Sequence, residues 1–529
     1  MVTEGLIDHI IHNHHDHDHD QHQHQHQHQH HQQQPQATTT TTGVARMFDN
    51  KSVFITGASG FIGRVLLEKL LRCYPGIKNI YLLMRSKKNV SPAERLHKTV
   101  LNAPIFDHVK SLDAASKHKL LDKITVVAGD ISEPQLGIND NDMQMMLNDP
   151  ALSIVFHSAA TIKFDEPLRV SVKLNLIATK TVIEFSRRLK NLISICHVST
   201  AFVNSHMPNA EIIEEKLYPM DQTPQQVIEL AENLDEETMQ TLKPELVASR
   251  PNTYTYTKAL AEHLIAMEAS DLPIAIVRPS IVVASWREPF PGWIDNLNGP
   301  TGLLLAIGKG LCRTAHVRRD CKSEIIPVDV VVNTMIASAY YAAKTKNKLG
   351  CGQRDELMTS ENGIEQINVD AGKAMAAASE PVSPNAVPIF HCNSGDLRPV
   401  RWGELERSVY PVIKHYPSVE TYRYPFGTFK RYKYHDLITR LFVHLLPALI
   451  LDSISGLMGK KRRLMWIYGK LHAALAALSY FTRNQFNFQT KNIQLLRDAL
   501  DGEDRKQLFM DIENISWILF WNDYVLGSR

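Results

Sequence analysis

Short apolar runs alternate with amphipathic segments over the first two thirds of the chain, beginning at residue 51. Six runs rich in Val, Ile, Leu and Phe predict buried β-strands at 52–56, 79–84, 124–128, 153–157, 192–198 and 273–277. Between them, apolar residues recur at helical spacing and predict helices that include 62–73, 171–189 and 252–269. Continuous apolar strands separated by helices are typical of a parallel sheet covered on both faces. The pattern therefore predicts a doubly wound α/β fold with a parallel, Rossmann-type sheet.

The pattern changes at both ends of this region. Residues 12–36 are nearly all His, Gln and Asp, and a threonine run follows, so no apolar face exists and a disordered tail is expected over 1–46. Loose binding of metal ions by this tail, and association of chains when its histidines are protonated, are the alternatives. After about residue 340 the alternation fades, and Lys344–Pro384 is polar and linker-like. From Trp402 onward, long helical patterns predict a mostly helical second domain, which gives expected domains at 47–400 and 401–529.

Composition and charge narrow the function classes. The chain has 529 residues, which is long enough for two or more domains, and 58 Lys and Arg against 56 Asp and Glu give a net charge of +2. This balance gives no electrostatic reason to expect nucleic acid as a partner. The six cysteines are scattered without a C-x-x-C pair, which favours a reduced intracellular protein with no metal site. No secretory signal is visible at the N-terminus, the last three residues are not S-K-L, and no feature indicates an oligomeric state.

A glycine motif stands at the first strand-to-helix junction. The sequence GASGFIG has the spacing G-x-x-G-x-x-G, in which the first glycine permits a tight turn and the second lets the backbone approach a pyrophosphate. The third allows close packing of helix on strand, and the helix N-terminus favours phosphate. A glycine-rich turn without a ligand is the alternative. The motif predicts a dinucleotide site formed by Gly57, Ser59, Gly60, Phe61, Ile62 and Gly63.

The end of the second strand indicates which cofactor binds. Sites for NAD usually place a carboxylate there, whereas this chain reads Met84-Arg85-Ser86-Lys87-Lys88. A guanidinium without a carboxylate suits the extra phosphate of NADPH, although a solvated basic loop would look the same. Asp130 and Ile131, after the third strand, are expected at the adenine, and Ala159, after the fourth, is small where the backbone must pass close to the cofactor.

The pattern Y-x-x-x-K places a phenol and an ammonium on one face of a helix. Such an ammonium is expected to lower the tyrosine pKa and so to assist proton transfer. The pattern occurs four times, but only Tyr254 and Lys258 lie on the helix between the fifth and sixth strands. Thr200 follows the fifth strand, and ligands of open α/β sheets bind at the carboxyl ends of strands. Thr200 and Tyr254 could therefore both donate to a carbonyl oxygen as hydride arrives.

These residues together resemble the extended short-chain dehydrogenase/reductases and, more closely, the fatty acyl-CoA reductases. The resemblance is strong over about 47–345 and looser over 400–525, where the family carries a helical C-terminal domain. The histidine-rich N-terminus departs from the family pattern but touches no motif. The segments that carry the resemblance are Val53–Gly63, Val155–Ala160, Ile195–Asn204, Asn252–Glu262, Val277–Ile281, Gly299–Gly302 and Ile326–Val330.

The resemblance implies that the protein reduces long-chain acyl-CoA to a primary alcohol through an aldehyde, with NADPH as the reductant and with release of CoA. It further implies that Tyr254 and Thr200 bind the developing oxyanion, and that Lys258 also holds the nicotinamide ribose. Pro279 would lie in the loop beside the nicotinamide, together with Arg278, and Asn175 would support an active-site water or the lysine. Two alternatives remain. One is another extended reductase, acting on a sterol, a sugar nucleotide or a carrier-bound thioester, and the other is an NADPH-binding membrane scaffold without turnover.

The most apolar stretch of the chain is Leu441–Leu451, which contains a proline and has charge at both edges. About 18 residues are available, the short limit for a membrane span. The cluster Lys460–Arg463 follows, and aromatic residues come next. This order suits a helix that lies in an anionic lipid interface, with a true span or a core helix as alternatives. We therefore expect an intracellular, membrane-associated protein that contacts lipid through residues 437–468, at the endoplasmic reticulum or another lipid-bearing organelle such as the peroxisome.

Overall fold

The computed structural model describes residues 42–528, apart from 88, 208, 210–211, 249, 359–386 and 419–420, and apart from the side chains of 347–358. Its centre is a parallel sheet of seven strands in the order β10-β6-β5-β4-β1-β2-β3. The order reverses between β1 and β4, which is where open α/β sheets bind ligands. The strands are β1 (Ser52–Thr56), β2 (Asn79–Met84), β3 (Ile124–Ala128), β4 (Leu152–His157), β5 (Ser194–Val198), β6 (Ile274–Pro279) and β10 (Ile389–Cys392).

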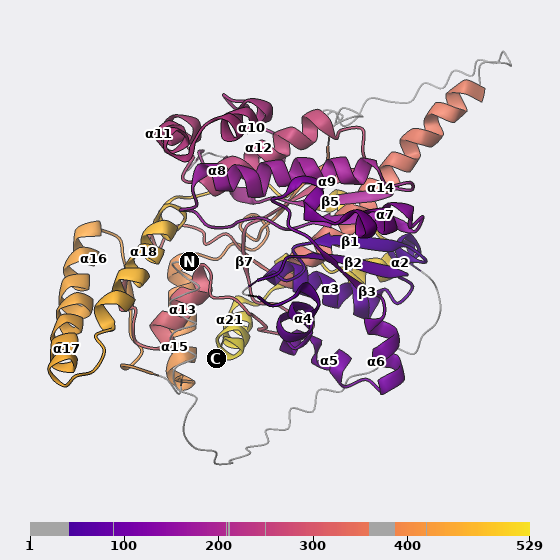
Figure 1. The fold of residues 1–529 in the computed structure, drawn as a ribbon. Helices are drawn as coiled ribbons and strands as arrows, with labels where there is room; N and C mark the ends of the chain where they lie inside the picture. Colours follow the sequence, from indigo (N-terminus) through magenta and orange to yellow (C-terminus); the bar gives the residue numbers. More distant parts are fainter. Residues whose placement is uncertain are drawn as a thin grey trace, which may run out of the picture.

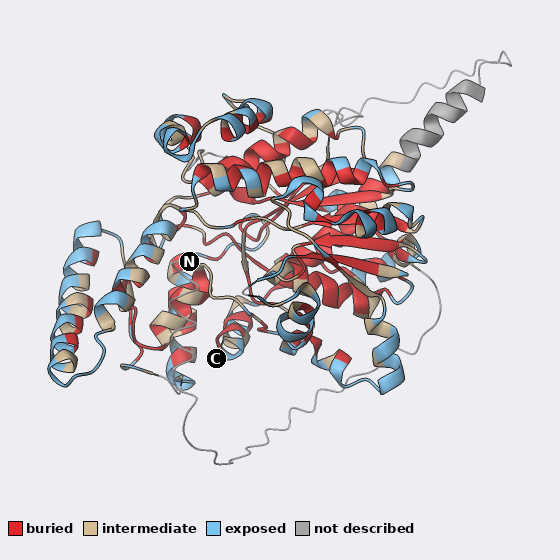
Figure 2. Cartoon of the chain, viewed as in Figure 1, coloured by how far each residue is buried: buried red, intermediate tan, exposed pale blue. Residues whose placement is uncertain are grey.

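Helices cover both faces of this sheet, and the inner strands are buried throughout (Figures 1 and 2). Successive strand residues alternate between two cores: Val155 and Ile195 pack under η4, α9 and α12, whereas Phe156 and Cys196 pack in the core that includes α3 and α14. The bounds of these helices are α3 (Phe61–Cys73), the π-helical η4 (Val172–Ile177), α9 (Ala178–Arg187), α12 (Thr253–Glu268) and α14 (Val328–Met358). The predicted doubly wound sheet is thus confirmed.

Shorter helices connect the strands and extend the two layers. Those before β5 are α2 (Gly43–Phe48), α4 (Pro92–Arg95), η1 (Leu96–Leu101), η2 (Pro104–Phe106), α5 (Asp107–Lys110), α6 (Ala114–Leu121), η3 (Pro134–Gly137), α7 (Asp140–Asn148) and α8 (Leu168–Ser171). Those after it are η5 (Ala201–Asn204), α10 (Pro224–Asn233), α11 (Glu236–Val247) and α13 (Pro300–Gly308). Two small parallel sheets pair β7 (Ile281–Val283) with β9 (Ile325–Pro327), and β8 (Thr314–His316) with β11 (Thr428–Lys430).

All six predicted strands are present, but the sequence analysis missed the seventh. Strand β10 has only four residues, and it follows a stretch without periodic signal. The linker-like assignment of Lys344–Pro384 was wrong for residues 344–358, which continue α14, and 359–386 lie outside the described residues. The predicted tail mostly lies outside them as well, but residues 43–46 belong to α2, where Val44 is fully buried.

The C-terminal part of the described chain is mostly helical, as predicted. Its elements pack beside and beneath the sheet (Figure 1). They are α15 (Trp402–His415), α16 (Lys433–Arg440), the π-helical η7 (Leu441–Leu445), α17 (Leu446–Leu457), α18 (Leu464–Arg483), α19 (Ile493–Ala499), α20 (Gly502–Gln507), η8 (Ile512–Asn514) and α21 (Trp517–Gly527).

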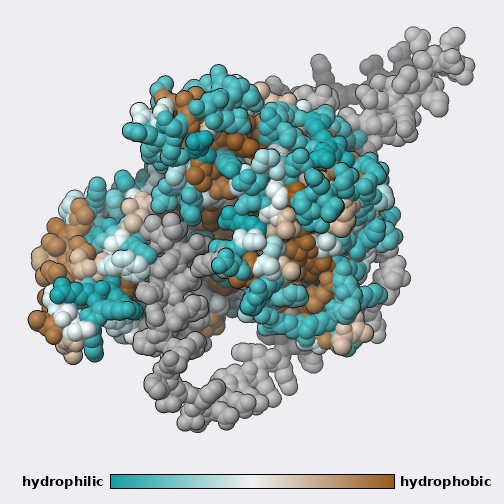
Figure 3. Space-filling model, in the orientation of Figure 1, coloured by the Kyte–Doolittle hydropathy of each residue, from teal (hydrophilic) through white to brown (hydrophobic). Residues whose placement is uncertain are grey.

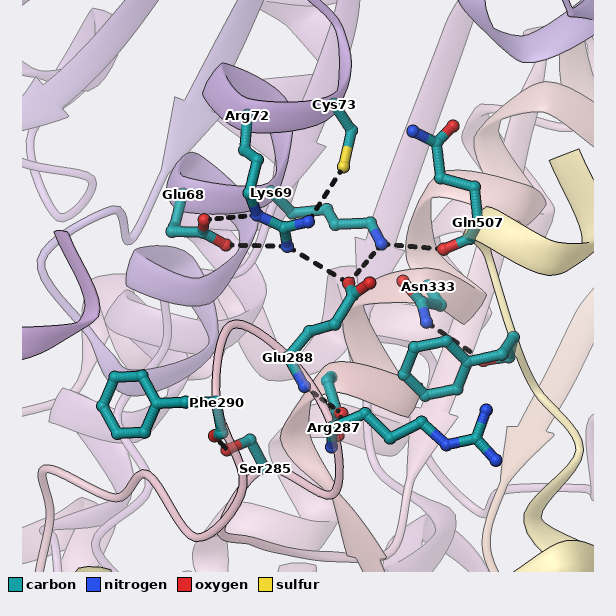
Figure 4. A network of polar contacts seen from close by, with 12 residues as sticks. Glu68, Lys69, Arg72, Cys73, Ser285, Arg287, Glu288, Phe290, Asn333 and Gln507 are labelled. Carbon is teal, nitrogen blue, oxygen red and sulfur yellow. Dashed lines mark hydrogen bonds and ion pairs between the residues drawn. The ribbon is translucent and has the colours of Figure 1, made fainter. Parts of the chain in front are cut away.

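A buried polar network fastens this C-terminal part to helix α3 (Figure 4). Lys69 is almost fully buried and donates both to Glu288 and to the backbone oxygen of Gln507, the latter over 2.7 Å. Arg72 pairs with Glu68 at 2.7 Å and with Glu288 at 3.1 Å. Buried charges are stable only when they are paired and hydrogen-bonded, so the helix behind the glycine motif depends on the residues around 507.

Within the described residues, one continuous helix is long and apolar enough to cross a membrane. It runs over 25 residues, Lys433–Leu457, and comprises α16, η7 and α17. Only 17% of its most apolar window is buried, and brown, apolar atoms cover this part of the surface at the left edge of Figure 3. A helix in the core of the protein would bury that apolar face. Here the face is exposed, which is typical of a surface that contacts another molecule or a membrane.

Candidate active site

The glycine loop has a geometry that only glycine permits. Gly57 follows β1 with φ of 82°, and a Cβ there would lie 2.7 Å from the backbone nitrogen of Ala159. At Gly63 a Cβ would lie 2.2 Å from the oxygen of Gly57, and the N–H of Gly60 closes the turn onto that oxygen at 2.9 Å. The loop therefore passes close under the start of α3, whose first N–H groups face a potential anion. This backbone cradle fits a dinucleotide diphosphate.

The end of β4 is held against this loop by side chains. The N–H of Ala159 donates to the Thr56 hydroxyl at 3.3 Å, and that hydroxyl lies 2.8 Å from Nδ1 of His157. Burial lowers the pKa of His157 to about 3, so its ring is neutral. Its other nitrogen, Nε2, lies 3.2 Å from the hydroxyl of Thr179, which itself donates to a backbone oxygen. A neutral His157 thus bridges β1, β4 and α9 and positions Ala159 beside the loop.

Three arginines gather beside the glycine loop, and the sequence analysis identified only one of them. Arg85 lies 3.4 Å from Asp130, and Arg64 pairs with Asp295. Arg95, at the end of α4, donates to the hydroxyl of Ser59 at 3.4 Å and to the backbone oxygen of Arg85. Burial lowers the pKa of Arg95, and the charges of Arg85 and Arg64 lower it further. Such crowding of like charges at a phosphate-binding loop fits an additional phosphate group.

The remaining predicted cofactor residues surround the same loop. Phe61 stacks on Trp293 with ring centroids 5.4 Å apart, and Ile62 packs against the core. Asp130 is partly buried, which would raise its pKa, but hydrogen bonds from Ser132 and the charge of Arg85 hold that pKa below its usual range. Ile131 is partly buried and packs against the core on the opposite face of the sheet.

Tyr254, Thr200 and Lys258 lie together at the carboxyl end of β5. Helix α12 begins at Thr253 because Asn252 caps it, which places Tyr254 in the first turn and Lys258 one turn later. Burial raises the pKa of Tyr254 to about 12, opposed by a hydrogen bond with Thr200. Burial also lowers the pKa of Lys258 to about 8, and its ammonium donates to the oxygen of Val198 at 2.7 Å.

The electrostatics differ from the expectation in one respect. The Y-x-x-x-K pattern predicted that Lys258 lowers the pKa of Tyr254, whereas burial raises it. Tyr254 is consequently a neutral phenol at physiological pH, which is the form that can donate a proton. The amide of Asn175 joins the backbone of Thr161 to the Thr257 hydroxyl, at 3.0 Å, so among the described contacts it does not reach Lys258. Its support of an active-site water stays a prediction.

Pro279 and Arg278, which are adjacent at the end of β6, make contacts in different parts of the structure. The backbone oxygen of Pro279 accepts from the Thr200 hydroxyl at 3.4 Å, so this residue borders the site. The side chain of Arg278 points away, into a buried ion pair with Glu262 at 2.6 Å and a contact with His391 of β10 at 3.1 Å. The resemblance placed Arg278 in the loop beside the nicotinamide, but its side chain joins the sheet to α12 and β10.

An apolar wall beside Tyr254 comes from distant parts of the chain. We call Phe164, Phe202, Phe481, Phe486 and Phe488 the aromatic cluster. The Phe164 ring lies 6.0 Å from Tyr254 and 5.3 Å from Phe481, and Phe202 contacts Phe481, Phe486 and Phe488 at 5.0 to 5.5 Å. The C-terminal residues of the cluster lie more than 200 positions after Tyr254, and no local sequence pattern predicted that they pack beside it.

Known proteins with similar sequences identify the family. An NAD-binding family model described as "Male sterility protein" matches residues 55–335, and a second model with the same description matches 443–529. Human "Fatty acyl-CoA reductase 1" is 34% identical over 488 residues, which cover 92% of this chain and 85% of that protein. The Xenopus laevis protein of the same name is 36% identical with the same coverage, and mouse "Fatty acyl-CoA reductase 2" is 34% identical over 486 residues.

The chain belongs to the fatty acyl-CoA reductase family. It is therefore an oxidoreductase with an NAD(P)-binding domain. Solved structures with the same fold include the terminal R domain from the myxalamid biosynthetic pathway, with a TM-score of 0.51 at 17% identity and 90% coverage of both chains. The R domain of a nonribosomal peptide synthetase from Mycobacterium tuberculosis has a TM-score of 0.50 at 16% identity, and the two chains are covered to 90% and 91%. These structures support the Rossmann-type fold of the reductase.

Proposed function

We propose that this reductase converts long-chain fatty acyl-CoA to a primary alcohol, through an aldehyde, with NADPH as reductant and with release of CoA. The observation that carries the proposal is the position of two hydroxyl donors, Tyr254 and Thr200, at the edge of the aromatic cluster. A thioester carbonyl can meet both donors while its acyl chain lies on apolar side chains. The names of the family relatives support the same substrate class.

Each residue of the site then has a defined task in two reductions. Bound NADPH supplies a hydride to the carbonyl carbon in each of them. In the first, Tyr254 and Thr200 hydrogen-bond the oxyanion, the C–S bond breaks, CoA leaves as the thiolate, and an aldehyde remains. In the second, Tyr254 gives its proton to the alkoxide oxygen and is then reprotonated from solvent. Lys258 keeps the tyrosine side of the site positively charged, and Pro279 and Ala159 border the nicotinamide half of the cofactor site.

The arginines around Ser59 support NADPH as the cofactor. We infer that Arg95, together with Arg85, binds the extra phosphate, because the Arg95 guanidinium reaches Ser59 of the glycine loop and lies close enough to Arg85 for the charge of Arg85 to lower its pKa. Replacing Arg95 by Ala should weaken NADPH binding about tenfold or more, since a charged hydrogen bond is worth about 1.5–3 kcal/mol, and should leave NADH binding unchanged. Lys98→Ala, which removes an exposed ion pair one turn further on, is the matched control. Equal losses for both nucleotides would contradict the assignment.

Replacement of Tyr254 by Phe tests the reaction itself. Purified protein with NADPH and a mixture of acyl-CoA chain lengths should give primary alcohol by mass spectrometry, and Tyr254→Phe should abolish the product while NADPH still binds. Tyr256→Phe is the control, because Tyr256 lies on the same helix but directs its hydroxyl to Gln222 at 3.2 Å. Unchanged turnover in Tyr254→Phe would refute the mechanism. Reduction of a sterol or carrier-bound thioester but not of acyl-CoA, or binding without any turnover, would favour the alternative reductase or the scaffold.

We also propose that the reductase attaches to an intracellular membrane through residues 437–468. One face of the Lys433–Leu457 helix exposes a row of large apolar side chains. Residues 421–483 contain eleven Lys and Arg but only two Asp, against a net charge of +2 for the whole chain. An apolar face bordered by cations suits an anionic lipid surface, such as that of the endoplasmic reticulum or the peroxisome. The exposed side chains are Leu437, Ile438, Leu441, Phe442, Leu449, Ile450, Ile454 and Leu457.

The opposite face of this helix favours a position in the interface over a span. Asp436 accepts from the Thr314 hydroxyl at 2.8 Å, and His444 accepts from the backbone of Arg313 at 2.9 Å. Asp452 caps α18 by accepting three backbone N–H groups between 2.9 and 3.1 Å. A spanning helix would lose these contacts and carry both carboxylates into hydrocarbon.

Vesicle flotation tests the attachment. Phe442→Glu should reduce binding to anionic vesicles, whereas Ile518→Glu, at an even more exposed apolar residue on α21, should not. Alkaline carbonate should release the wild-type protein from membranes. Resistance to carbonate would show a span, and equal binding by both variants would refute the attachment face.

A further inference from the structure

Five cations gather where the loop before β9 meets the C-terminal part of the chain. We call Arg318, Lys322, Arg401, Arg431 and Arg483 the basic cluster. The N–H of Arg318 donates to the oxygen of Thr482 at 3.1 Å, and its guanidinium reaches the oxygen of Arg483 at 3.4 Å. Lys322 and Arg401 pair as an isolated antiparallel bridge. Arg431 lies close enough to Asp320 for its charge to lower the pKa of that carboxyl, so four segments of the chain bring these cations together.

Few carboxylates offset this charge. Asp320 pairs with Arg318 at 2.8 Å, and the charge of Arg431 also lowers its pKa. Glu404 accepts from the backbone of Arg401 at 3.0 Å. The nearby Arg319 is neutralised by its own partner, Glu406, at 2.7 Å. Burial raises the pKa of Glu324 to about 7, and the charge of Lys322 opposes that rise, so Glu324 is a third carboxylate beside the basic cluster. Five cations thus face three carboxylates, a local excess of two positive charges in a chain whose total is +2.

Fold stability does not explain this excess. The side chains of Arg318 and Asp320 are 37% and 52% exposed, and ion pairs this exposed contribute only about 0–1 kcal/mol. Like charges at close range cost free energy unless an anion accompanies them. Guanidinium groups in particular match the geometry of phosphate oxygens.

The basic cluster borders the aromatic cluster directly. Phe481 is the residue that contacts Phe164 beside Tyr254, and Arg483 follows it by two positions at the end of α18. The ammonium of Lys322 donates to the side chain of Asn487 at 3.1 Å, and Asn487 stands between Phe486 and Phe488. The cations therefore lie at the rim of the same apolar wall that begins at Tyr254.

A second connection runs along the carboxyl edge of the sheet. Thr200 contacts the oxygen of Pro279, and the next residue, Ser280, bonds to the end of β10 through the oxygen of Cys392 at 3.0 Å. Asn393 then donates to Glu324 at 3.2 Å, and Glu324 follows Lys322 by two positions. The basic cluster is thus joined to the catalytic edge through the sheet as well as through α18.

We propose that the basic cluster binds the phosphate groups of the CoA half of the substrate. This inference rests on the proposed function. Coenzyme A carries a diphosphate and a 3′-phosphate at the far end of a long, uncharged pantetheine arm. With the thioester at Tyr254 and Thr200, that arm leads from the site to the basic cluster, and the acyl chain lies on the aromatic cluster. The apolar acyl chain thus contacts the aromatic cluster, and the anionic CoA half of the same substrate contacts the neighbouring basic cluster.

The two reductions provide an internal control, because the aldehyde of the second step carries no CoA. The variants Arg318→Gln and Lys322→Gln, combined, should raise KM for acyl-CoA about tenfold or more, as expected for loss of charged phosphate contacts. The value of kcat/KM for the fatty aldehyde of the same chain length should stay within about twofold of the wild-type value, because the aldehyde has no phosphate for these residues to bind. Arg187→Gln, which removes an exposed arginine paired with Asp271 on the other side of the sheet, is the matched control.

Binding of CoA alone gives a readout that does not require turnover. Calorimetry should show weaker binding of CoA to the double variant, and 3′-dephospho-CoA should bind the wild-type protein more weakly than CoA does. Unchanged KM for acyl-CoA, an equal loss with the aldehyde, or loss of vesicle binding with KM unchanged in detergent would each overturn the proposal. If the wild-type protein reduces the aldehyde but no acyl-CoA, the proposed function fails, whatever the variants do.

Discussion

Glu215 should make the stability of this reductase fall as pH rises from 5 to 8. The side chain lies between β10 and the segment before α19, where it accepts from the backbone of His391 and of Asn492, each at 2.7 Å. Burial raises the pKa of Glu215 to about 7, although those two hydrogen bonds and the charge of Arg278 oppose the rise, and Asp396 adds to it. Deprotonation of Glu215 is therefore harder in the folded protein than in the unfolded chain.

The sign and the size of this pH effect on the free energy of unfolding follow from the difference in proton binding between the folded and the unfolded state. Between its ordinary pKa and about 7, the folded state holds a proton that the unfolded state has lost, so the free energy of unfolding decreases as pH rises through this window. A rise from 4.5 to about 7 corresponds to about 3 kcal/mol. Glu215→Gln removes the titration but keeps one acceptor, at a cost of about 1 kcal/mol for the weakened hydrogen bond. The variant should match the wild-type stability near pH 5, where the two curves cross, and should be about 2 kcal/mol more stable at pH 8.

Urea unfolding at pH 5, 6, 7 and 8 measures this crossover. The neighbouring Glu214 is exposed and pairs with Lys216 at the surface, so Glu214→Gln is the matched control and should keep the wild-type slope. Glu324, whose pKa burial also raises to about 7, contributes a slope of the same sign to all three proteins and cancels in their differences. If Glu215→Gln and the wild-type protein showed parallel pH dependence, the link between burial and stability at this residue would be refuted.

Two further substitutions test the fold around the site. Gly63→Ala should weaken both NADPH and NADH binding about tenfold, because its Cβ would meet the oxygen of Gly57 at 2.2 Å and overpacking costs about 1–3 kcal/mol. Fluorescence titration measures this, and Gly469→Ala, with no atom within 4 Å, should instead stabilise the protein by about 0.5–1 kcal/mol. Arg278→Met should cost about 3–5 kcal/mol in urea unfolding because it leaves the buried Glu262 unpaired. Adding Glu262→Leu should recover most of that loss, and a double variant as unstable as the single one would contradict the explanation.

The sheet could be predicted from the sequence because each of its six long strands is a continuous apolar run between helical patterns. Strand β10 escaped prediction because four residues contain too little periodicity, and its place beside β6 depends on tertiary contacts such as that of His391 with Arg278. The continuation of α14 past Lys344 was missed for the opposite reason, since its outer turns are polar and resemble a linker. A local pattern therefore misses a strand too short to repeat it, such as β10, and helical turns whose sequence has no apolar face, such as the end of α14.

The site residues that could be predicted belong to short sequence motifs with fixed spacing, the glycine motif and the Y-x-x-x-K pattern. The glycines, Tyr254 and Lys258 are set by one loop and one helix, so their neighbours in sequence are also their neighbours in space. Arg95 lies only ten residues after Arg85 and directly after a predicted helix start, and the signal for it was therefore available. Phe481 and Lys322 had no such signal, because their place beside Tyr254 depends on how the C-terminal part packs. The raised pKa of Tyr254 is likewise a property of burial that no motif encodes.

Helix α18 connects the exposed apolar face of the Lys433–Leu457 helix to the active site. Its first turn is fixed by Asp452, at the end of the apolar face, and its last turn carries Phe481 beside the catalytic edge. Near that end the hydroxyl of Tyr480 donates to the oxygen of Ser205 at 2.6 Å, so neither end can move without breaking contacts. Twenty residues span about 30 Å, so the first turn of α18, beside Asp452, lies about that far from its last turn, which carries Phe481. On the proposed function, this helix would hold the aromatic cluster at a set distance from the membrane that the apolar face contacts.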